Sequence, residues 1–182
     1  MSSWENYVSE NARVLSLVDQ DLITKTVRSI REVSSAGGTV WVLGNGGSAS
    51  LASHAVADFS KTIKGLGGSP VKTIAPSEMV SLQSAYANDT NFTEGFASTL
   101  KIYGSGLDLV LVISVSGRSP NLVNALEVAK SKGMNSCAWV GTKGAGLVDL
   151  VDNLVVFDSD DYQIVENAQV SLMHWITKEM AN

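Results

Sequence analysis

The chain has 182 residues, of which 45% are hydrophobic and 17% are charged. This balance is typical of a globular domain with a substantial core and excludes an intrinsically disordered chain. The formal net charge of −5 argues against nonspecific binding to nucleic acid, which depends on lysine and arginine, although a local loop can still bind a small anion.

The single cysteine, Cys137, excludes an internal disulfide and fits a cytoplasmic setting. Its apolar neighbours favour core packing over the alternative of a reactive thiol. The N-terminus lacks the basic and apolar regions of a signal peptide, and the longest apolar run, Leu109–Ile113, is too short to span a bilayer. We therefore expect no membrane partner. Since no linker or repeat is present, we expect one domain over residues 1–182, with an N-terminal helical extension over about 1–36.

The N-terminal part of the chain is predicted to be helical, because apolar residues recur at spacings of three and four from about Ser3 to Ser35. Asp19 or Asp21 is placed to cap a second helix within this stretch, and the glycines after Ala36 end it. The elements predicted next are a strand at Thr39–Leu43, a helix at about Ala49–Lys61, a loop at Gly65–Pro70, a short strand at Val71–Ala75, a helix capped by Ser77 and running through Ala87 before Asn88-Asp89, and a helix from Phe92 to about Tyr103.

The strongest strand signal is the near-continuous apolar run Leu107–Ile113, which indicates a strand buried on both faces. Strands that alternate with helices at this spacing predict an α/β fold with a parallel sheet, whose ligands bind beyond the carboxyl ends of the strands. The elements predicted after this run are a polar turn at Ser114–Pro120, a helix to Lys132, a strand at Ser136–Val140, a glycine-rich loop at Gly141–Gly146, a strand at Asn153–Phe157 and a helix at about Asp161–Met180.

The first polar turn, Gly44–Ser48, follows an apolar strand and opens a helix. Its glycines allow positive φ and close approach of a ligand, and free N–H groups at a helix N-terminus attract an anion such as phosphate. Gly44-x-Gly46-x-x-Ala49 also satisfies the relaxed dinucleotide fingerprint, but the next strand ends without an acidic residue for the ribose, and no Walker A lysine is present. A tight turn without a ligand is the alternative for this loop alone.

The second polar turn places Ser114, Ser116 and Ser119 between a strand and a helix. Hydroxyl groups together with free helix N–H groups make a socket for a phosphate monoester. Ordinary helix punctuation by Ser119-Pro120 is the alternative, and it accounts for Ser119 but not for the other two serines. The two loops together predict a phosphate-binding protein.

At this point the sequence resembles a known family. Gly44–Ser48 with His54 six residues later, the stretch Ile113–Asn121, and the late helix with Glu166 and His174 resemble the sugar isomerase (SIS) domain of the phosphoheptose isomerases. The resemblance covers nearly the whole chain. It implies a doubly wound, flavodoxin-like fold with a central five-stranded parallel sheet flanked by helices, plus extra N-terminal helices. It also implies the isomerisation of sedoheptulose 7-phosphate to an aldose heptose 7-phosphate through an enediol, for heptose biosynthesis.

The chain has two histidines, His54 and His174. His54 and Asp58 share a helix face, whereas Glu166 and His174 are two turns apart on one helix, a rise of roughly 12 Å. Two imidazoles and two carboxylates suit Zn²⁺. The resemblance implies that His54, Asp58, Glu166 and His174 are metal ligands or acid–base groups, with one zinc ion per subunit. His174 is the candidate for one proton-transfer group, and Asp58 or Glu166 for the other.

The resemblance also implies a set of substrate-binding residues, with some departures from the family pattern. Asp58 stands where the family has glutamate, Glu166 where it has glutamine and Thr62 where it has arginine. Gln163 stands where the family has an aspartate, although Asp161 is close by. The implied substrate-binding residues are Asn45, Gly46, Gly47, Ser48, Asn88, Asp89, Ser114, Val115, Ser116, Ser119 and Glu166.

Two other functions remain open: a non-catalytic SIS module that binds phosphosugars or a protein partner, and an isomerase of another sugar phosphate. A module without catalysis does not need all four of His54, Asp58, Glu166 and His174. The N-terminal helices and the last helix carry more apolar surface than one small sheet needs. The resembled family forms homotetramers, so we expect a homo-oligomer.

Overall fold

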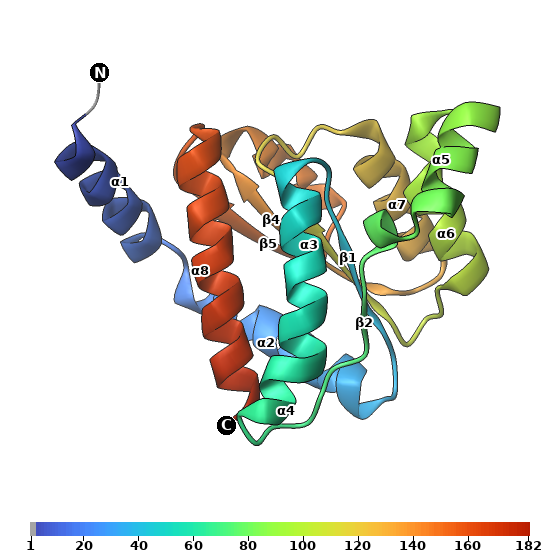
Figure 1. The fold of residues 1–182 in the computed structure, drawn as a ribbon, viewed down its shortest axis with the longest axis horizontal. Helices are drawn as coiled ribbons and strands as arrows, with labels where there is room; N and C mark the ends of the chain where they lie inside the picture. Colours follow the sequence, from blue (N-terminus) through green and yellow to red (C-terminus); the bar gives the residue numbers. More distant parts are fainter. Residues whose placement is uncertain (1–2) are drawn as a thin grey trace.

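The computed structural model describes residues 3–182, and its centre is a parallel sheet in the strand order β2-β1-β3-β4-β5 (Figure 1). This order is that of flavodoxin-like doubly wound proteins, so the predicted fold class is confirmed. The strands are β1 (Val40–Leu43), β2 (Thr73–Ile74), β3 (Leu109–Ile113), β4 (Asn135–Gly141) and β5 (Asn153–Phe157).

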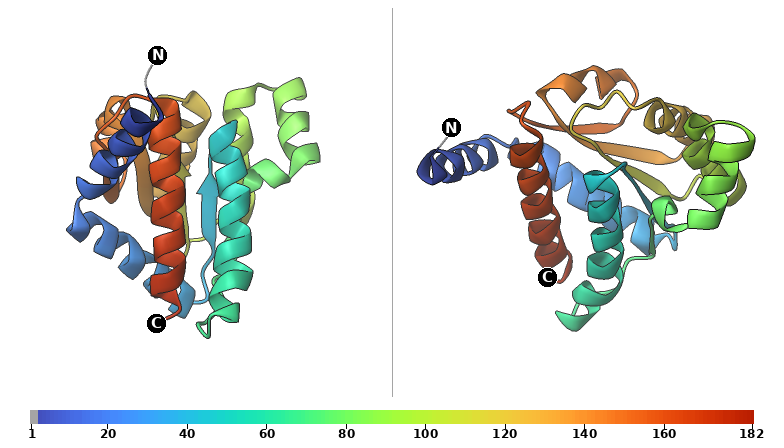
Figure 2. Two further views of the ribbon diagram at one scale, coloured as in Figure 1. Left: turned by 60° about the vertical axis from the view of Figure 1, so that its left-hand side comes forward. Right: turned by 45° about the horizontal axis from the view of Figure 1, so that its top comes forward.

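Helices cover both faces of the sheet (Figures 1 and 2). The helices are α1 (Trp4–Ser16), α2 (Gln20–Ser35), α3 (Gly47–Ala57), α4 (Ile63–Gly65), α5 (Val80–Asp89), α6 (Gly95–Tyr103), α7 (Pro120–Ser131) and α8 (Tyr162–Met180). One π-turn (Asp58–Thr62) joins α3 to α4, and 3₁₀ turns lie at Pro76–Glu78, Phe92–Glu94 and Thr142–Asp149. Within residues 3–182 no helix combines the length and apolarity that a membrane crossing needs.

Alternate side chains of each central strand enter two separate cores. Val40 and Val42 pack with α2, α3 and α8 on one face, whereas Trp41 and Leu43 pack with α6 and α7 on the other. Every residue of β3 is buried, as the apolar run predicted. Cys137 lies in the first core, and burial raises the pKa of its thiol to about 12, which agrees with core packing.

Helix ends follow the predicted capping chemistry. The Asp19 carboxylate accepts hydrogen bonds from the N–H groups of Asp21 and Leu22, at 2.8 and 3.3 Å, so Asp19 is the cap of α2. Gly37, with φ of 76°, lies just after the C-cap of this helix. Asp161 caps α8 by accepting from the N–H of Gln163 at 3.0 Å. Its carboxylate therefore has a structural role.

Several predicted boundaries were wrong. α3 starts two residues early, at Gly47, because Gly46 adopts a left-handed φ of 55°, and it changes to a π-turn at Asp58. β2 is short because the Val71 N–H donates to the carbonyl oxygen of Phe59, in the π-turn after α3, instead of to the sheet. The predicted cap Ser77 lies within the 3₁₀ turn Pro76–Glu78, so α5 begins at Val80 instead. The predicted loop at Gly141–Gly146 is largely 3₁₀ helix.

The buried carboxylate of Asp108 joins the start of β3 to the start of β1. It accepts hydrogen bonds from Thr39 N–H, Trp41 Nε1–H and Ser105 N–H, each at 2.9 Å. Burial raises the pKa of Asp108, but these hydrogen bonds together outweigh burial and hold the pKa below its usual value. The ionised carboxylate therefore stabilises the edge of the sheet opposite the polar loops.

We expect Asp108→Asn to lower the free energy of unfolding by about 3 kcal/mol at neutral pH, because hydrogen bonds to a charged acceptor are lost. A carboxylate with a lowered native pKa stabilises the fold above the unfolded pKa of about 4, and this contribution is lost as the pH falls through the native pKa. The difference in the free energy of unfolding between the wild type and Asp108→Asn, measured with urea, should therefore become smaller below about pH 4. The exposed Asp149→Asn is the control, and a gap that stays constant down to low pH would contradict the role of Asp108.

Candidate functional site

The serine loop, Ser114–Ser119, connects β3 to α7 at the carboxyl edge of the sheet. Ser114 Oγ accepts from the Gly117 N–H at 3.0 Å, and Gly117 has a φ of 61°. A Cβ at Gly117 would lie 2.6 Å from the Cα of Gly144, so the loop requires glycine there. Ser119 occupies the N-cap position of α7, but its side chain makes no capping hydrogen bond. The Ser119 hydroxyl therefore does not cap α7.

The glycine loop, Gly44–Ser48, connects β1 to α3 at the same edge. A Cβ at Gly44 would lie 2.5 Å from the carbonyl oxygen of Ser48, so the strand end and the first turn of α3 pack backbone to backbone. Ser48 is buried, and Gly46 and Gly47 form the helix start. The tight strand–glycine–helix turn that the sequence predicted is present.

Reciprocal hydrogen bonds between two amides join the two loops. Asn45 Nδ2 donates to Asn121 Oδ1 at 3.0 Å, and Asn121 Nδ2 donates to Asn45 Oδ1 at 2.9 Å. Asn121 is only 2% exposed, at the start of α7. Sequence reasoning missed its role, although it directly follows the Ser119-Pro120 helix start. The predicted ligand residue Asn45 thus also holds the glycine loop to α7.

A buried glutamine fastens the serine loop to α8. Gln169 Nε2 donates to the carbonyl oxygens of Ser114 and Trp139, at 3.3 and 2.9 Å, and the residue is fully buried. This residue was also missed in the sequence. Its signal was a polar residue on the apolar face of the last helix. Gln169 fixes the distance between the serine loop and the helix that carries Glu166 and His174.

Helices α3 and α8 run side by side in the same direction, with their N-termini at the loop edge (Figures 1 and 2). Glu166, in the first turns of α8, lies beside the start of α3: a Cβ at Gly47 would be 2.7 Å from Glu166 Oε1. His54 and His174 lie seven and eight residues further along their helices, a rise of about 11 Å. Their imidazole rings meet edge to face, with centroids 5.1 Å apart.

Asp58 lies beside these two histidines and forms a group of three with them. Its Oδ2 lies 3.7 Å from Nε2 of His54 and 3.7 Å from Nε2 of His174. The Asp58 side chain is 12% exposed, whereas both histidine side chains are about half exposed. The resemblance implied that His54, Asp58, Glu166 and His174 would act together, and the fold brings His54, Asp58 and His174 together.

This group has donors that suit zinc. Its ligand atoms lie within 4.8 Å of one another, and three protein ligands with an open position are typical of catalytic zinc sites. Zinc bonds of 2.0–2.2 Å place tetrahedral ligand atoms about 3.4 Å apart, close to the 3.7 Å separations here. Glu166 is outside this group, because its carboxylate lies against Gly47.

The remaining predicted residues lie in other surroundings. Asn88 and Asp89 are exposed at the end of α5, where Asn88 Nδ2 donates to Asp89 Oδ1 at 2.7 Å. Helix α5 packs mainly on α6 and the neighbouring 3₁₀ turns, away from α8 (Figure 1). The Val115 side chain is buried and its carbonyl oxygen accepts from the Gly141 N–H, so the side chain does not face a ligand.

A cavity of about 230 Å³ lies beside the glycine loop. The buried Ser77 Oγ, which has no hydrogen-bond partner within residues 3–182, belongs to a residue that lines it. The lining is uncharged and consists of Gly44, Asn45, Gly46, Ala49, Ser77, Gln83, Phe92, Phe96 and Asn121.

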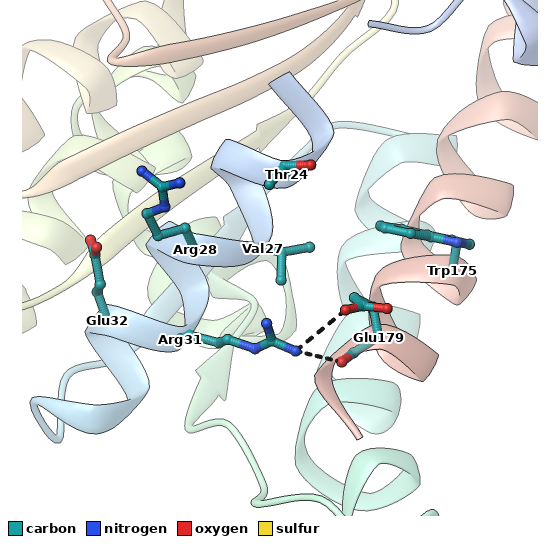
Figure 3. Close-up of a pocket in the computed structure, with 7 residues that line it drawn as sticks. All are labelled: Thr24, Val27, Arg28, Arg31, Glu32, Trp175 and Glu179. Atoms are coloured by element: carbon teal, nitrogen blue, oxygen red, sulfur yellow. Dashed lines mark hydrogen bonds and ion pairs between the residues drawn. The ribbon is translucent and has the colours of Figure 1, made fainter. Parts of the chain in front are cut away.

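A groove of about 310 Å³ lies between α2 and α8 and contains none of the predicted site residues (Figure 3). Arg31 reaches across it from α2 and donates to the carbonyl oxygen of Glu179 at 2.7 Å. Trp175, which is 46% exposed, lines this groove and an adjoining apolar one that includes Leu15 and Ile23. The surface formed by α1, α2 and α8 thus exposes apolar side chains, such as Trp175 and Leu15, beside the charged residues of α2.

Comparisons with known proteins identify relatives over most of the chain. A family model described as the SIS domain matches residues 3–141. The phosphoheptose isomerase of Thermodesulfovibrio yellowstonii is 36% identical over 154 residues, which cover 84% of this chain and 76% of that protein. That of Bradyrhizobium sp. is 32% identical over 171 residues, which cover 92% and 86%. The solved structure of a phosphoheptose isomerase from Francisella tularensis shares the fold, with a TM-score of 0.89, 23% identity and coverage of 97% and 93%.

The amide pair between the loops predicts energetic coupling. We expect Asn45→Ala and Asn121→Ala each to lower the free energy of unfolding by about 1–2 kcal/mol, since each leaves a partly buried amide without its partner. The double variant should lose less than the sum, by about 1 kcal/mol, in denaturant unfolding. Asn45→Ala combined with Asn124→Ala, one turn further along α7, is the control and should be additive. If the losses in the free energy of unfolding for Asn45→Ala and Asn121→Ala were additive, the two amides would not be coupled.

Proposed function

Because the chain belongs to the phosphoheptose isomerase family of SIS-domain proteins, we propose that it converts sedoheptulose 7-phosphate to D-glycero-heptose 7-phosphate. The observation that carries this proposal is the convergence of His54, Asp58 and His174 from two helices at one exposed point. A module that only binds phosphosugars does not require three chemically active groups in contact. An isomerase requires proton-transfer groups beside the reacting carbons.

The phosphate of the substrate is proposed to bind the serine loop. Ser114, Ser116 and Ser119 lie at the N-terminus of α7, where hydroxyl groups and the positive end of the helix dipole attract an anion. The Glu166 carboxylate already places negative charge at the N-terminus of α3, and this charge repels a second anion at the glycine loop. The glycine loop, with Asn45, Gly46, Gly47 and Ser48, would then border the sugar hydroxyls, with Asn88-Asp89 as the further predicted contact.

The reaction moves a proton between C1 and C2 of the sugar. A base takes a proton from C1 of the ketose, the C2 carbonyl oxygen gains a proton to give an enediol, and C2 is then protonated as the O1 proton leaves. His174 is the proposed group for one of these transfers, and Asp58 or Glu166 for the other. Phosphate bound at the serine loop holds the reacting end in place.

A zinc ion is the proposed cofactor, held by His54, Asp58 and His174. Glu166, which the resemblance added to this ligand set, lies two turns away beside Gly47 and is left for proton transfer or substrate binding. Such an ion would polarise the carbonyl group of the substrate. The half-exposed histidines leave the site open to water on one side. Burial of the apolar side chains exposed on α1 and α8, such as Leu15 and Trp175, against further copies is the proposed basis of a homo-oligomer. The resembled family forms tetramers, and the cytoplasm is the proposed location.

The direct test is incubation of the purified protein with sedoheptulose 7-phosphate, with detection of the aldose product before and after treatment with a chelator. We expect turnover that chelation reduces and Zn²⁺ restores. Binding of the sugar phosphate without turnover in either metal state, in a folded protein, would identify a non-catalytic phosphosugar-binding module. Turnover of another sugar phosphate in preference would identify a different isomerase.

The proposed division of roles predicts different kinetic effects for two variants. Ser116→Ala removes a phosphate contact and should mainly raise KM, by about tenfold. His174→Ala removes a proton-transfer group and should lower kcat by about 10²-fold or more. Ser131→Ala, which deletes a hydroxyl at the other end of α7, is the control and should change neither constant. The opposite pattern would reverse the assigned roles.

A further inference from the structure

The two oxygens of the Asp58 carboxylate have different partners. Oδ1 accepts a hydrogen bond from Thr62 Oγ1 at 3.0 Å, whereas Oδ2 lies 3.7 Å from both histidine Nε2 atoms. The distances to the histidines are longer than hydrogen bonds, so the Thr62 hydroxyl is the group that holds this carboxylate within residues 3–182. Oδ2 remains free to bind a cation between the two imidazoles.

Asp58 and Thr62 are the first and last residues of the π-turn that interrupts the helix after α3. In this turn the Ile63 N–H donates to the Asp58 carbonyl oxygen. Single π-turns are rare and occur frequently at functional sites. Other bonds hold the turn in place: the Val71 N–H donates to the Phe59 carbonyl oxygen at 2.9 Å, and Ser60 Oγ donates to the Val71 carbonyl oxygen at 3.1 Å. The backbone of the turn therefore does not depend on the Thr62 hydroxyl.

The torsion that rotates a carboxylate is soft, so an aspartate alone does not fix the direction of its oxygens. A hydroxyl that donates to one oxygen removes this freedom and leaves the other oxygen with a defined direction. We propose that Thr62 is a positioning residue, whose hydroxyl orients Asp58 so that Oδ2 is presented to a divalent cation held with His54 and His174. This inference deepens the proposed function and rests on it, since that function assigns zinc to these three residues.

The test compares the Zn²⁺ affinity of four proteins by competition with a chromophoric chelator. Thr62→Val keeps the shape and removes the donor, and it should weaken Zn²⁺ binding by about 10–100-fold, as loss of an outer partner of a metal ligand does. Thr62→Ser keeps the donor and should stay within about threefold of the wild-type affinity. Ser60→Ala removes a hydroxyl from the same turn without touching Asp58, and it should bind Zn²⁺ like the wild type.

A second readout does not require metal. Crystal structures of the metal-free variants should show the Asp58 carboxylate rotated or in several orientations in Thr62→Val, and unchanged in Thr62→Ser. Wild-type Zn²⁺ affinity in Thr62→Val, or an equal loss in Ser60→Ala, would overturn the positioning role. If the wild-type protein binds no Zn²⁺, the proposed metal site is wrong, and an unmoved carboxylate in Thr62→Val would overturn the positioning role separately.

Discussion

The parallel, side-by-side packing of α3 and α8 is the constraint on which the candidate site depends (Figure 2). Each helix starts at the carboxyl edge of the sheet, so equal steps along the two helices reach equal depths. Near the starts of the helices, Glu166 lies beside Gly47. Two turns further along, His174 lies beside His54 and Asp58. A shift of one helix by a single turn would move His54 and His174 about 5 Å further apart and disrupt the three-residue group.

Two buried amide side chains hold the loops in register with these helices. Asn121 pairs with Asn45 and joins the serine loop to the glycine loop, while Gln169 holds the Ser114 carbonyl oxygen to α8. Buried amides are costly unless they are hydrogen-bonded, so they favour one arrangement of the loops over others. The proposed phosphate socket and the proposed catalytic group are thereby placed on one rigid frame, which suits a reaction that needs a fixed substrate.

The carboxylates of two buried aspartates, Asp108 and Asp58, differ in their partners. Asp108 accepts from three N–H donors at hydrogen-bond distance and stabilises the fold at the edge away from the loops. Asp58 accepts from Thr62 on one oxygen, while the other faces two imidazoles at 3.7 Å. Asp58 Oδ2 therefore accepts no hydrogen bond from a group within residues 3–182, and a bound cation or a reacting substrate is the partner that we propose for it.

The fold class and the two polar loops followed from the sequence, because periodicity, glycines and serine spacing are local properties of the chain. The run Leu107–Ile113 predicted a buried strand for the same reason, and the structure has this strand at Leu109–Ile113. The sequence did not predict three other features. These are the π-turn at Asp58, the position of Glu166 beside Gly47, and the hydrogen bonds of Asn121 and Gln169. Each depends on a contact between segments that are distant in sequence or on a competition between backbone hydrogen bonds, and only the packed tertiary structure decides such contacts.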